Sequence, residues 1–464
     1  MSTGSNATRP RPGALERLKE RGFFAQCTDE EALRKRMDSD PITFYVGVDP
    51  TGSSLHVGHL VPLYAMAHLI EYGHNAIVIV GDGTARIGDP SGKIEMRKMM
   101  SVEQIDANAE AIGKQIERFL RQRVEQSMES SSAGGSSSAE AVPGVADAPG
   151  AVGASAPFTM VRNAEWLASL NYIEFLRDIG RHFSVNRMLG FETYKMRLET
   201  GLSFIEFNYQ LLQSYDFLKL YQTRGCQLQI GGDDQWGNIV AGADLIRRVE
   251  GSKAESFGLT FPLVTRSDGK KMGKTEQGAV FLDPEVVTPY DFFQYWRNVA
   301  DADVRKFLLM YTFLPLQEID EITREGGAAI NAAKERLARE VTTLIHGPEE
   351  ADAALAAARA LFAGPGSAGS ASEGAGAGGG AVDVPGADLP EAELQAGIGI
   401  LDLYVRAGLC GSKGEARRLV QQGGARINEE KISDPETIVG PVHAEEGALM
   451  LRAGKKRYFR FNVV

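Results

Sequence analysis

Short apolar runs alternate with stretches of helical periodicity along the chain. Runs typical of strands buried on both faces of a sheet lie at 44–48, 76–80 and 227–230. A helical pattern at about 57–72 connects the first two runs, which predicts a β-α-β unit with parallel strands. Further helical patterns cover 164–200, 204–223, 283–347 and 352–362. We therefore predict an α/β fold in which a Rossmann-like parallel-sheet domain with a helical insertion precedes a mostly helical domain.

Two low-complexity stretches, 127–157 and 364–387, interrupt these patterns. Both are rich in Ser, Ala and Gly and hold too few apolar side chains to offset the entropy of ordering. Because helical patterns flank the first stretch, we interpret it as an insertion in a loop, whereas the second separates the body from a compact C-terminal unit. The predicted organisation is a disordered N-terminus at 1–14, a Rossmann-like domain at 15–265, a helical domain at 266–363, a flexible linker at 364–395 and a small α+β domain at 396–464.

Composition narrows the class of protein. The 464 residues are 43% hydrophobic and 24% charged, which is ordinary for a globular protein, and the net charge of -11 argues against an indiscriminate polyanion binder. Three widely spaced cysteines predict neither a metal site nor a disulfide framework. The N-terminus has no apolar core of a signal peptide, and no apolar run approaches the length of a membrane span. We expect a cytoplasmic protein without a membrane partner.

The strand at 44–48 is followed by Pro50, Thr51 and Gly52 and then by two histidines at the start of a helix. His56 and His59 are three residues apart, so they share one helix face near the positive end of the helix dipole, where an anion is favoured. Gly58 lies between them and lets a flat ring approach the backbone. These features predict a binding site for a nucleotide.

A second signal, at 271–275, places Lys271 and Lys274 on a loop around Gly273. Two ammonium groups on such a loop can close over a polyphosphate. Each signal alone has a bland interpretation as surface charge, but their occurrence in one α/β chain predicts a cradle for ATP. The run beginning at Gly81 lacks the third glycine of a dinucleotide fingerprint, and the run around Lys93 lacks the earlier glycine and the hydroxyl of a P-loop.

The helix predicted at 204–221 is apolar on nearly every side and should be buried. Tyr209, Gln213 and Asp216 nevertheless fall on one of its faces. Buried polar groups need partners, so this stripe is either a satisfied core network or the wall of a pocket for a polar small molecule.

From residue 397 to the end the balance of charge is basic, whereas the rest of the chain is acidic. Ser412 and Glu415 have the spacing of a capping box that opens a helix at 416–421, and two glycines at 423–424 end it. Arg426 begins a short predicted strand. Basic side chains placed in this way are typical of contacts with nucleic-acid phosphates.

These motifs resemble those of a known family. The segments 56–59 and 271–275 resemble the two signatures of class I aminoacyl-tRNA synthetases. The segments 45–51, 87–93 and 231–238 resemble bacterial-type tyrosyl-tRNA synthetases in particular, and 408–419 resembles an S4-type RNA-binding module. The resemblance covers roughly 15–362 and the C-terminal unit, excluding the two low-complexity stretches.

The resemblance implies that the protein joins L-tyrosine to ATP, releases pyrophosphate and transfers the tyrosine to the 3′ end of tRNA(Tyr). It implies Mg²⁺ with ATP, no tightly bound cofactor, no metal-ligand set, and a homodimer. The implied tyrosine-binding residues are Tyr45, Asp89, Tyr209, Gln213, Asp216 and Gln235. The implied ATP-binding residues are Gly47, Asp49, Thr51, His56, Gly58, His59, Gly232, Asp234, Lys271 and Lys274, with Lys93 and Arg97 on a mobile loop. The implied tRNA-binding residues are Lys413, Arg417, Arg418, Arg426, Lys455, Lys456 and Arg457.

Three alternatives remain at this stage. A tryptophanyl enzyme shares both ATP signatures, although Tyr45 and Asp216 disfavour it. Another nucleotidyltransferase with the two histidines would lack the lysine loop and the RNA module. A non-catalytic RNA-binding relative would have lost signature side chains, all of which are present here. The departures from the family pattern are Val46 and Asp233, which stand where small polar or small residues are common.

Overall fold

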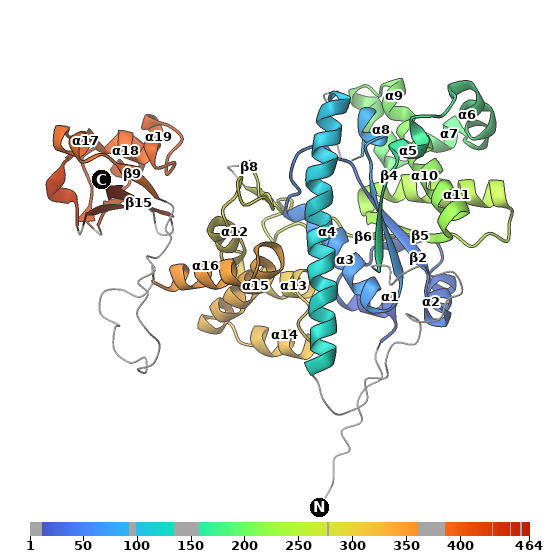
Figure 1. The fold of residues 1–464 in the computed structure, drawn as a ribbon, viewed down its shortest axis with the longest axis horizontal. Helices are drawn as coiled ribbons and strands as arrows, with labels where there is room; N and C mark the ends of the chain where they lie inside the picture. Colours follow the sequence, from blue (N-terminus) through green and yellow to red (C-terminus); the bar gives the residue numbers. More distant parts are fainter. Residues whose placement is uncertain are drawn as a thin grey trace, which may run out of the picture. The chain divides into compact units, whose positions relative to one another are not determined.

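The chain folds into two compact units, Met1–Ala351 and Asp352–Val464 (Figure 1). The computed structural model describes residues 12–91, 99–133, 157–275, 278–360, 386–428, 430–445, 447–454 and 457–464. In the described parts of the chain, no helix is both long and apolar enough to cross a membrane.

A six-stranded sheet with strand order β1-β6-β5-β2-β3-β4 forms the centre of the first unit. The three predicted strands are present as β2 (Thr43–Val48), β3 (Asn75–Val80) and β5 (Cys226–Gly232), and they pair in parallel. Three strands were missed by the sequence analysis: β1 (Gln26–Cys27), β4 (Phe158–Arg162) and β6 (Phe257–Phe261). Only β1 runs antiparallel to its neighbour, so the predicted Rossmann-like sheet is confirmed.

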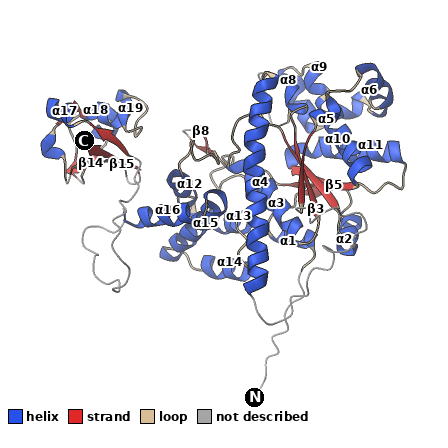
Figure 2. Cartoon of the chain, viewed as in Figure 1, coloured by secondary structure: helices blue, strands red, loops and turns tan. Residues whose placement is uncertain are grey.

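Helices cover both sides of this sheet (Figure 2). Apolar side chains point to both sides of β2 and β3, which is why the sheet needs two layers of helices. One layer contains α3 (Leu60–Glu71) and α4 (Val102–Ala133), and the other contains α10 (Tyr209–Arg224) and α11 (Trp236–Glu250). The smaller helices α1 (Ala14–Glu20) and α2 (Glu30–Ser39) complete the N-terminal part.

The segment around the first low-complexity stretch differs from the prediction. Helix α4 continues through the predicted insertion start at 127 as far as Ala133, because its residues keep a helical, amphipathic pattern. The predicted insertion otherwise lies outside the described residues at 134–156. The chain then resumes as strand β4 rather than as a helix, because 158–162 pair along their whole length with the edge of β3.

The region predicted as long helices is broken into short ones. It consists of α5 (Ala164–Leu167), α6 (Tyr172–Asp178), α7 (Val185–Met188), α8 (Glu192–Thr200) and α9 (Phe204–Phe207), and α10 begins only after Asn208. Local caps explain several of the breaks. Asn171 accepts hydrogen bonds from the first amides of α6, and Ser203 with Glu206 forms a capping box on α9.

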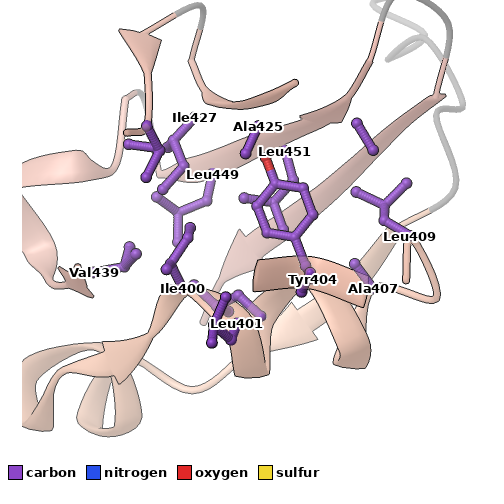
Figure 3. Close-up of a cluster of buried hydrophobic side chains, with 14 of the residues drawn as sticks. Ile400, Leu401, Tyr404, Ala407, Leu409, Ala425, Ile427, Val439, Leu449 and Leu451 are labelled. Atoms are coloured by element: carbon purple, nitrogen blue, oxygen red, sulfur yellow. The ribbon is translucent and has the colours of Figure 1, made fainter. Parts of the chain in front are cut away.

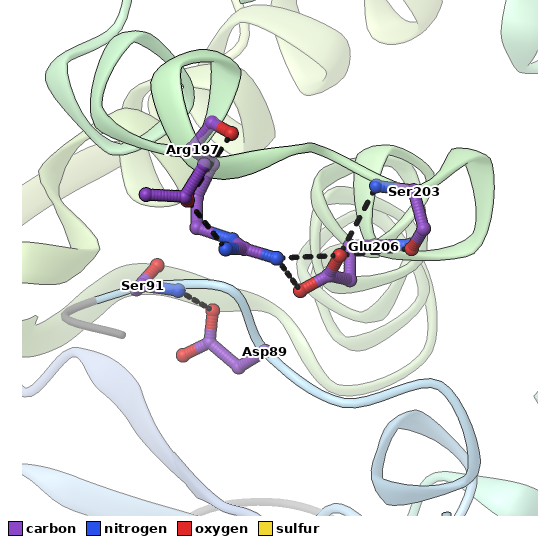
Figure 4. Close-up of polar contacts among 6 residues, drawn as sticks. Asp89, Ser91, Arg197, Ser203 and Glu206 are labelled. Atoms are coloured by element: carbon purple, nitrogen blue, oxygen red, sulfur yellow. Dashed lines mark hydrogen bonds and ion pairs between the residues drawn. The ribbon is translucent and has the colours of Figure 1, made fainter. Parts of the chain in front are cut away.

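A buried ion pair joins α8 to α9 (Figure 4). Both oxygens of the Glu206 carboxylate accept hydrogen bonds from the Arg197 guanidinium, at 2.9 and 3.0 Å. The side chains are only 2% and 3% exposed, so each charge depends on the other for compensation. Ser203 donates to the same carboxylate through its amide and its hydroxyl. This pair fixes the turn from which α10 starts toward the site.

A mostly helical part follows the sheet, as predicted. It comprises α12 (Pro289–Arg297), α13 (Asp301–Tyr311), α14 (Leu316–Thr323) and α15 (Ala328–His346), and α16 (Pro348–Ala360) comes next in sequence. Aromatic side chains form its core, with Trp296 packed edge-on against Phe307 and Tyr311. Arg21 of the sheet domain reaches into this part and donates to the carbonyl of Thr312 at 2.9 Å. The helical part and the sheet domain are therefore packed together within the first unit.

The C-terminal unit contains a five-stranded sheet with order β12-β11-β14-β15-β9. Its strands are β9 (Gly386–Leu389), β11 (Ala425–Ile427), β12 (Glu430–Lys431), β14 (Ala448–Ala453) and β15 (Arg457–Val463), and a separate pair is formed by β10 (Ile398–Gly399) and β13 (Ile438–Val439). Helices α17 (Glu391–Ala396), α18 (Ile400–Arg406) and α19 (Lys413–Gln421) accompany them. Ile400 and Tyr404 of α18 pack with Leu449 and Leu451 of β14 in the unit's own core (Figure 3).

Two details of this unit differ from the sequence analysis. The residues 386–395, predicted as linker, contain β9, which pairs with β15, and α17, whose Leu394 belongs to the core. The folded unit therefore begins about ten residues earlier than predicted, because pairing with a distant strand leaves no local signal. Ser412 does cap α19 by accepting from the Glu415 amide, but the Glu415 carboxylate accepts from Gly411 instead of Ser412.

Candidate active site

A cavity of about 430 Å³ opens beyond the carboxyl ends of β2, β3 and β5. Gly47, Gly81 and Gly232, which stand at or just after these strand ends, contribute to its wall. This is the position in which open parallel α/β sheets bind their ligands, because loops and helix starts converge there.

Fifteen of the residues predicted for tyrosine and ATP line this one cavity. They are Tyr45, Gly47, Asp49, Thr51, His56, Gly58, His59, Asp89, Tyr209, Gln213, Asp216, Gly232, Asp234, Gln235 and Lys271. The backbone of Lys274 begins strand β7 (Lys274–Thr275), which pairs with β8 (Gly278–Ala279), and Lys93 and Arg97 lie outside the described residues. The roles of these residues remain predictions, but their convergence is a feature of the structure.

Backbone hydrogen bonds tie the histidine signature to the lysine signature. Val57 donates its amide to the carbonyl of Val280 at 2.9 Å, and Val280 donates its own amide to Gly273 at 2.9 Å. A Cβ atom added to Gly273 would come within 3.2 Å of the Gly58 nitrogen. The two signatures, more than two hundred residues apart, are thus in direct contact.

The two histidines form a compact pair at the start of the helical segment. The rings lie 4.0 Å apart between centroids. His56 accepts from the Gly58 amide, and the Nδ1 atom of His59 accepts from the His56 amide, both at 3.1 Å. A Cβ atom at Gly58 would lie 2.8 Å from the Cε1 atom of His56, so the glycine makes room for this imidazole. The approach of a ligand ring to Gly58 remains a prediction.

Asp216 is buried and is held by side chains that the sequence analysis missed. Its carboxylate accepts from Trp166 Nε1 at 2.7 Å and from Asn163 Nδ2 at 2.9 Å. Burial raises its pKa from 3.8 to about 7, although these two hydrogen bonds work in the opposite direction. Nearby Tyr45 is 1% exposed, and its hydroxyl has no hydrogen-bond partner among the described residues. Two polar groups at this cavity are therefore available to a ligand hydroxyl.

A polar network continues from Asp216 along the cavity wall. Asn163 donates to Thr84, and Thr84 donates to Asp49 at 2.7 Å. Tyr209 donates its hydroxyl to the other oxygen of Asp49 at 2.8 Å. The resemblance gave Asp49 a place beside the nucleotide, and the structure also joins it to the stripe on α10. Asn163 and Thr84 escaped the sequence analysis because Asn163 follows the missed strand β4 and Thr84 lies in a turn.

A second network of side-chain hydrogen bonds connects Asp89, Gln213 and Gln235, three of the predicted tyrosine-binding residues. Gln235 donates to Asp89 at 2.7 Å, and Asn238 donates to both Gln213 and Gln235 at 3.0 Å. Asn238 was absent from the predicted set, although it shares the first turn of α11 with Gln235. The pKa of Asp234 is raised, first by burial and then by the neighbouring charge of Asp89. This part of the cavity is acidic.

The predicted RNA-binding residues are spread over two elements and a strand start in the second unit. Lys413, Arg417 and Arg418 are exposed on α19, where Lys413 pairs with Asp402 and Arg417 with Glu436. On the sheet, Arg426 is in cross-strand register with Lys431 and Arg452, two basic residues that were not predicted. Arg457 begins β15, and Lys455 and Lys456 lie outside the described residues.

Comparison with known proteins assigns the family. The family described as tRNA synthetases class I (W and Y) matches residues 37–363, and the Tyrosine--tRNA ligase SYY-like C-terminal domain matches residues 381–461. The chain therefore belongs to the class I tRNA synthetases of the tryptophan and tyrosine group.

Individual relatives indicate to which family within this group the chain belongs. The chain is 55% identical to the Tyrosine--tRNA ligase of Treponema denticola, over 96% of this chain and 98% of that protein. It is 47% identical to the Tyrosine--tRNA ligase of Caldanaerobacter subterraneus, over 97% and 99%. Within the class, it is a member of the tyrosine--tRNA ligase family.

Solved structures agree with this assignment. A C-terminally truncated mitochondrial tyrosyl-tRNA synthetase from Aspergillus nidulans matches with a TM-score of 0.65 and 29% identity, over 76% of this chain and 95% of that chain. The tyrosyl-tRNA synthetase of Archaeoglobus fulgidus, solved with L-tyrosine, is similar in fold, with a TM-score of 0.51 and 18% identity over 74% and 99%.

The raised pKa of Asp216 predicts a pH dependence of stability. Because the folded protein holds this proton more tightly than the unfolded chain, the contribution of Asp216 is fully present below about pH 4 and is lost as the pH rises to about 7. Relative to Asp216→Asn, which does not titrate, the free energy of unfolding of the unmodified protein should fall by about 4 kcal/mol across this window and then stay level. Urea unfolding of both proteins between pH 4 and 8 measures this difference. Parallel pH curves would contradict the prediction.

Proposed function

We propose that this protein activates L-tyrosine with ATP and transfers it to tRNA(Tyr). The observation that carries the proposal is the shared cavity, which has Tyr45 and Asp216 in its wall together with His56, His59 and Lys271. The first pair offers hydrogen bonds to a phenol, and the second set offers imidazole and ammonium groups to a triphosphate. One cavity can thus hold both reactants of adenylate formation.

Selection of tyrosine rests on Tyr45 and Asp216. A phenol hydroxyl can donate to the Asp216 carboxylate and accept from the hydroxyl of Tyr45, which has no hydrogen-bond partner among the described residues. Phenylalanine would leave both groups desolvated and unpaired, and such groups are costly to bury. Trp166 and Asn163 hold the carboxylate in place, so they act as positioning residues.

The ammonium and carboxylate of tyrosine need partners farther along the wall. Asp89, Tyr209 and Gln213 supply oxygen acceptors for the ammonium, in line with the acidic character of this region. Gln235 lies beside Asp89 and is suited to the substrate carboxylate. The amide chain through Asn238 limits the rotation of Gln213 and Gln235, so the site is ordered before the substrate enters.

ATP would lie along the contact between the two signatures. We assign Thr51 and His56 to its phosphate end, His59 and Asp234 to its ribose, and Gly47 and Gly232 to surfaces that its flat parts can approach. Lys271 and Lys274, with Lys93 and Arg97, would neutralise the departing pyrophosphate. Mg²⁺ would enter as part of the ATP substrate.

The chemistry needs little beyond positioning and charge. The tyrosine carboxylate is already ionised at neutral pH, so it attacks the α-phosphorus without a general base. The bond to the pyrophosphate oxygen breaks as the new one forms, and cationic side chains stabilise the developing charge. The 3′ end of the tRNA then takes tyrosine from the adenylate.

The second unit is proposed to bind the tRNA. Arg426, Lys431 and Arg452 lie side by side across three strands, and Arg452 packs over the ring of Tyr458 at 5.2 Å. A basic sheet surface of this kind suits phosphates and exposed bases. We assign Lys413, Arg417, Arg418, Arg457, Lys455 and Lys456 to the same function.

We also propose a homodimer formed through helices α6 to α9. Large apolar side chains are exposed on these helices, among them Ile173 at 70% and Phe204 at 69%. Such a group of exposed apolar residues is typical of an interaction surface.

We propose that the protein functions in the cytoplasm. Its cysteines, Cys27, Cys226 and Cys410, are free thiols, which is usual for proteins in a reducing compartment.

The activity is tested by ATP–pyrophosphate exchange with each amino acid. We expect exchange with tyrosine and not with tryptophan or phenylalanine.

Lys274→Ala should leave the affinity for tyrosine intact and slow adenylate formation by about a hundredfold, because one phosphate-binding cation is lost. Lys253→Ala, which removes an exposed lysine that does not line the cavity, is the matched control. Adenylate formation at an unchanged rate in Lys274→Ala would exclude this role.

Removal of the second unit should separate the two reactions. A protein ending at residue 360 should keep tyrosine-dependent exchange, because the cavity lies wholly in the first unit. Charging of tRNA(Tyr) should fall at least tenfold through weaker tRNA binding, measured as a rise in KM for tRNA. Equal loss of exchange and charging would contradict the assignment of adenylate formation to the first unit and of tRNA binding to the second.

A charge placed on α6 or α9 should dissociate the dimer. Ile173→Asp and Phe204→Asp each place a carboxylate in the proposed apolar interface, so sedimentation should show monomers at low micromolar concentration. Val442→Asp, which alters an equally exposed apolar residue of the second unit, should leave the dimer unchanged. Dimers that persist in both interface variants would place the interface elsewhere.

A further inference from the structure

The loop that carries the lysine signature folds back on itself as a short hairpin. Met272 donates its amide to Val264 at 2.9 Å, and Arg266 donates to Lys270 at 2.9 Å. Met272 is 5% exposed and lines the cavity together with Lys271 and Gly273. The position of this hairpin therefore decides where its cationic side chains meet a nucleotide.

Helix α13 holds the tip of the hairpin, where the chain turns at 267–269. The Asp303 carboxylate, 4% exposed, accepts from the amide of Ser267 through both oxygens and from its hydroxyl at 2.9 Å. Lys306 donates to the carbonyl of Thr265 at 2.8 Å. These bonds join the start of the loop to the helical part of the unit.

Tyr295 of α12 holds the open end of the hairpin, at Met272 and Gly273. Its hydroxyl accepts a hydrogen bond from the Gly273 amide at 3.0 Å and donates to the sulfur of Met272 at 3.0 Å. The ring packs edge-on against Trp296, which is fully buried in the core of the helical part. The packing against Trp296 therefore fixes the position of the Tyr295 hydroxyl beside the loop.

Gly273 is restrained from both sides. Its amide is held by Tyr295, and its carbonyl is held by Val280, which in turn accepts from Val57 in the histidine signature. Its φ of 81° lies in the left-handed region, and a Cβ atom there would make a tight contact of 3.2 Å with the Gly58 nitrogen. Lys271 and Lys274 flank this residue, so a change in its orientation redirects both.

We propose that Tyr295 is a positioning residue for adenylate formation, acting through Gly273 on the lysines of the loop. This inference rests on the proposed function, because it assigns Tyr295 to the ATP half of that reaction. In this arrangement the phenol fixes the loop in the orientation that the structure shows, next to the histidine signature. Asp303 anchors the turn of the hairpin, and Tyr295 sets the orientation of the opposite end, at Gly273.

The test is Tyr295→Phe, which removes both hydrogen bonds and keeps the ring. The rate constant for adenylate formation, followed by rapid mixing with saturating ATP, should fall about three- to tenfold, as expected for the loss of one or two neutral hydrogen bonds. Tyrosine affinity measured by calorimetry should stay unchanged, and the melting temperature should fall by no more than a few degrees. Tyr311→Phe is the matched control, because this buried tyrosine of the same core has no hydrogen-bond partner for its hydroxyl among the described residues.

A double-mutant cycle distinguishes positioning from general weakening of the fold. If Tyr295 acts through the lysine loop, Tyr295→Phe should add little to the slow rate of Lys274→Ala. Multiplicative effects, a matching loss of tyrosine affinity, or an unchanged rate in Tyr295→Phe would each overturn the inference. Failure of the proposed function is recognised separately, because the unmodified protein would then show no tyrosine-dependent exchange.

Discussion

The structure depends on one set of backbone hydrogen bonds, which runs from Val57 through Val280 to Gly273. It joins a strand-to-helix turn near the start of the chain to a loop more than two hundred residues later. Backbone groups make these bonds, so they do not require particular side chains, but they do require small residues where the segments touch. Gly58 and Gly273 meet that requirement, and their contact brings His56, His59 and Lys271 to one cavity.

The polar wall of the cavity is held by side-chain hydrogen bonds to buried groups. Asp216 is held by Trp166 and Asn163, and Asn163 continues through Thr84 to Asp49. Such a network keeps a carboxylate inside the protein at a free-energy cost that a ligand donor would reduce. The hydroxyl of Tyr45, which has no hydrogen-bond partner among the described residues, has the same consequence. A ligand hydroxyl would satisfy both groups, and this is the basis that we propose for selectivity for tyrosine over phenylalanine.

The helical part of the first unit helps to fix the position of the lysine loop at the cavity. Its helices hold the lysine loop through Asp303 and Tyr295, and Arg21 of the sheet domain donates to the carbonyl of Thr312 at the end of α13. The loop is thus attached to the same body that packs against the sheet domain. Because close-packed bodies move as units, a displacement of these helices would be transmitted to the loop. The geometry of the proposed ATP site therefore depends on both the sheet domain and the helical part.

The sequence by itself determined the buried strands β2, β3 and β5, the two signatures, the stripe on α10 and the family, because each is a local pattern of apolar, glycine or charged residues. Only the tertiary structure decided that β4 and β9 are strands, that Asn163, Trp166 and Thr84 support Asp216 and Asp49, and that Tyr295 holds the lysine loop. These features arise from pairing and hydrogen bonding between residues far apart in the chain. A side chain such as Trp166 or Tyr295 has the same local pattern whether it fills a core or orients a site, so its partner can be known only when the chain is folded.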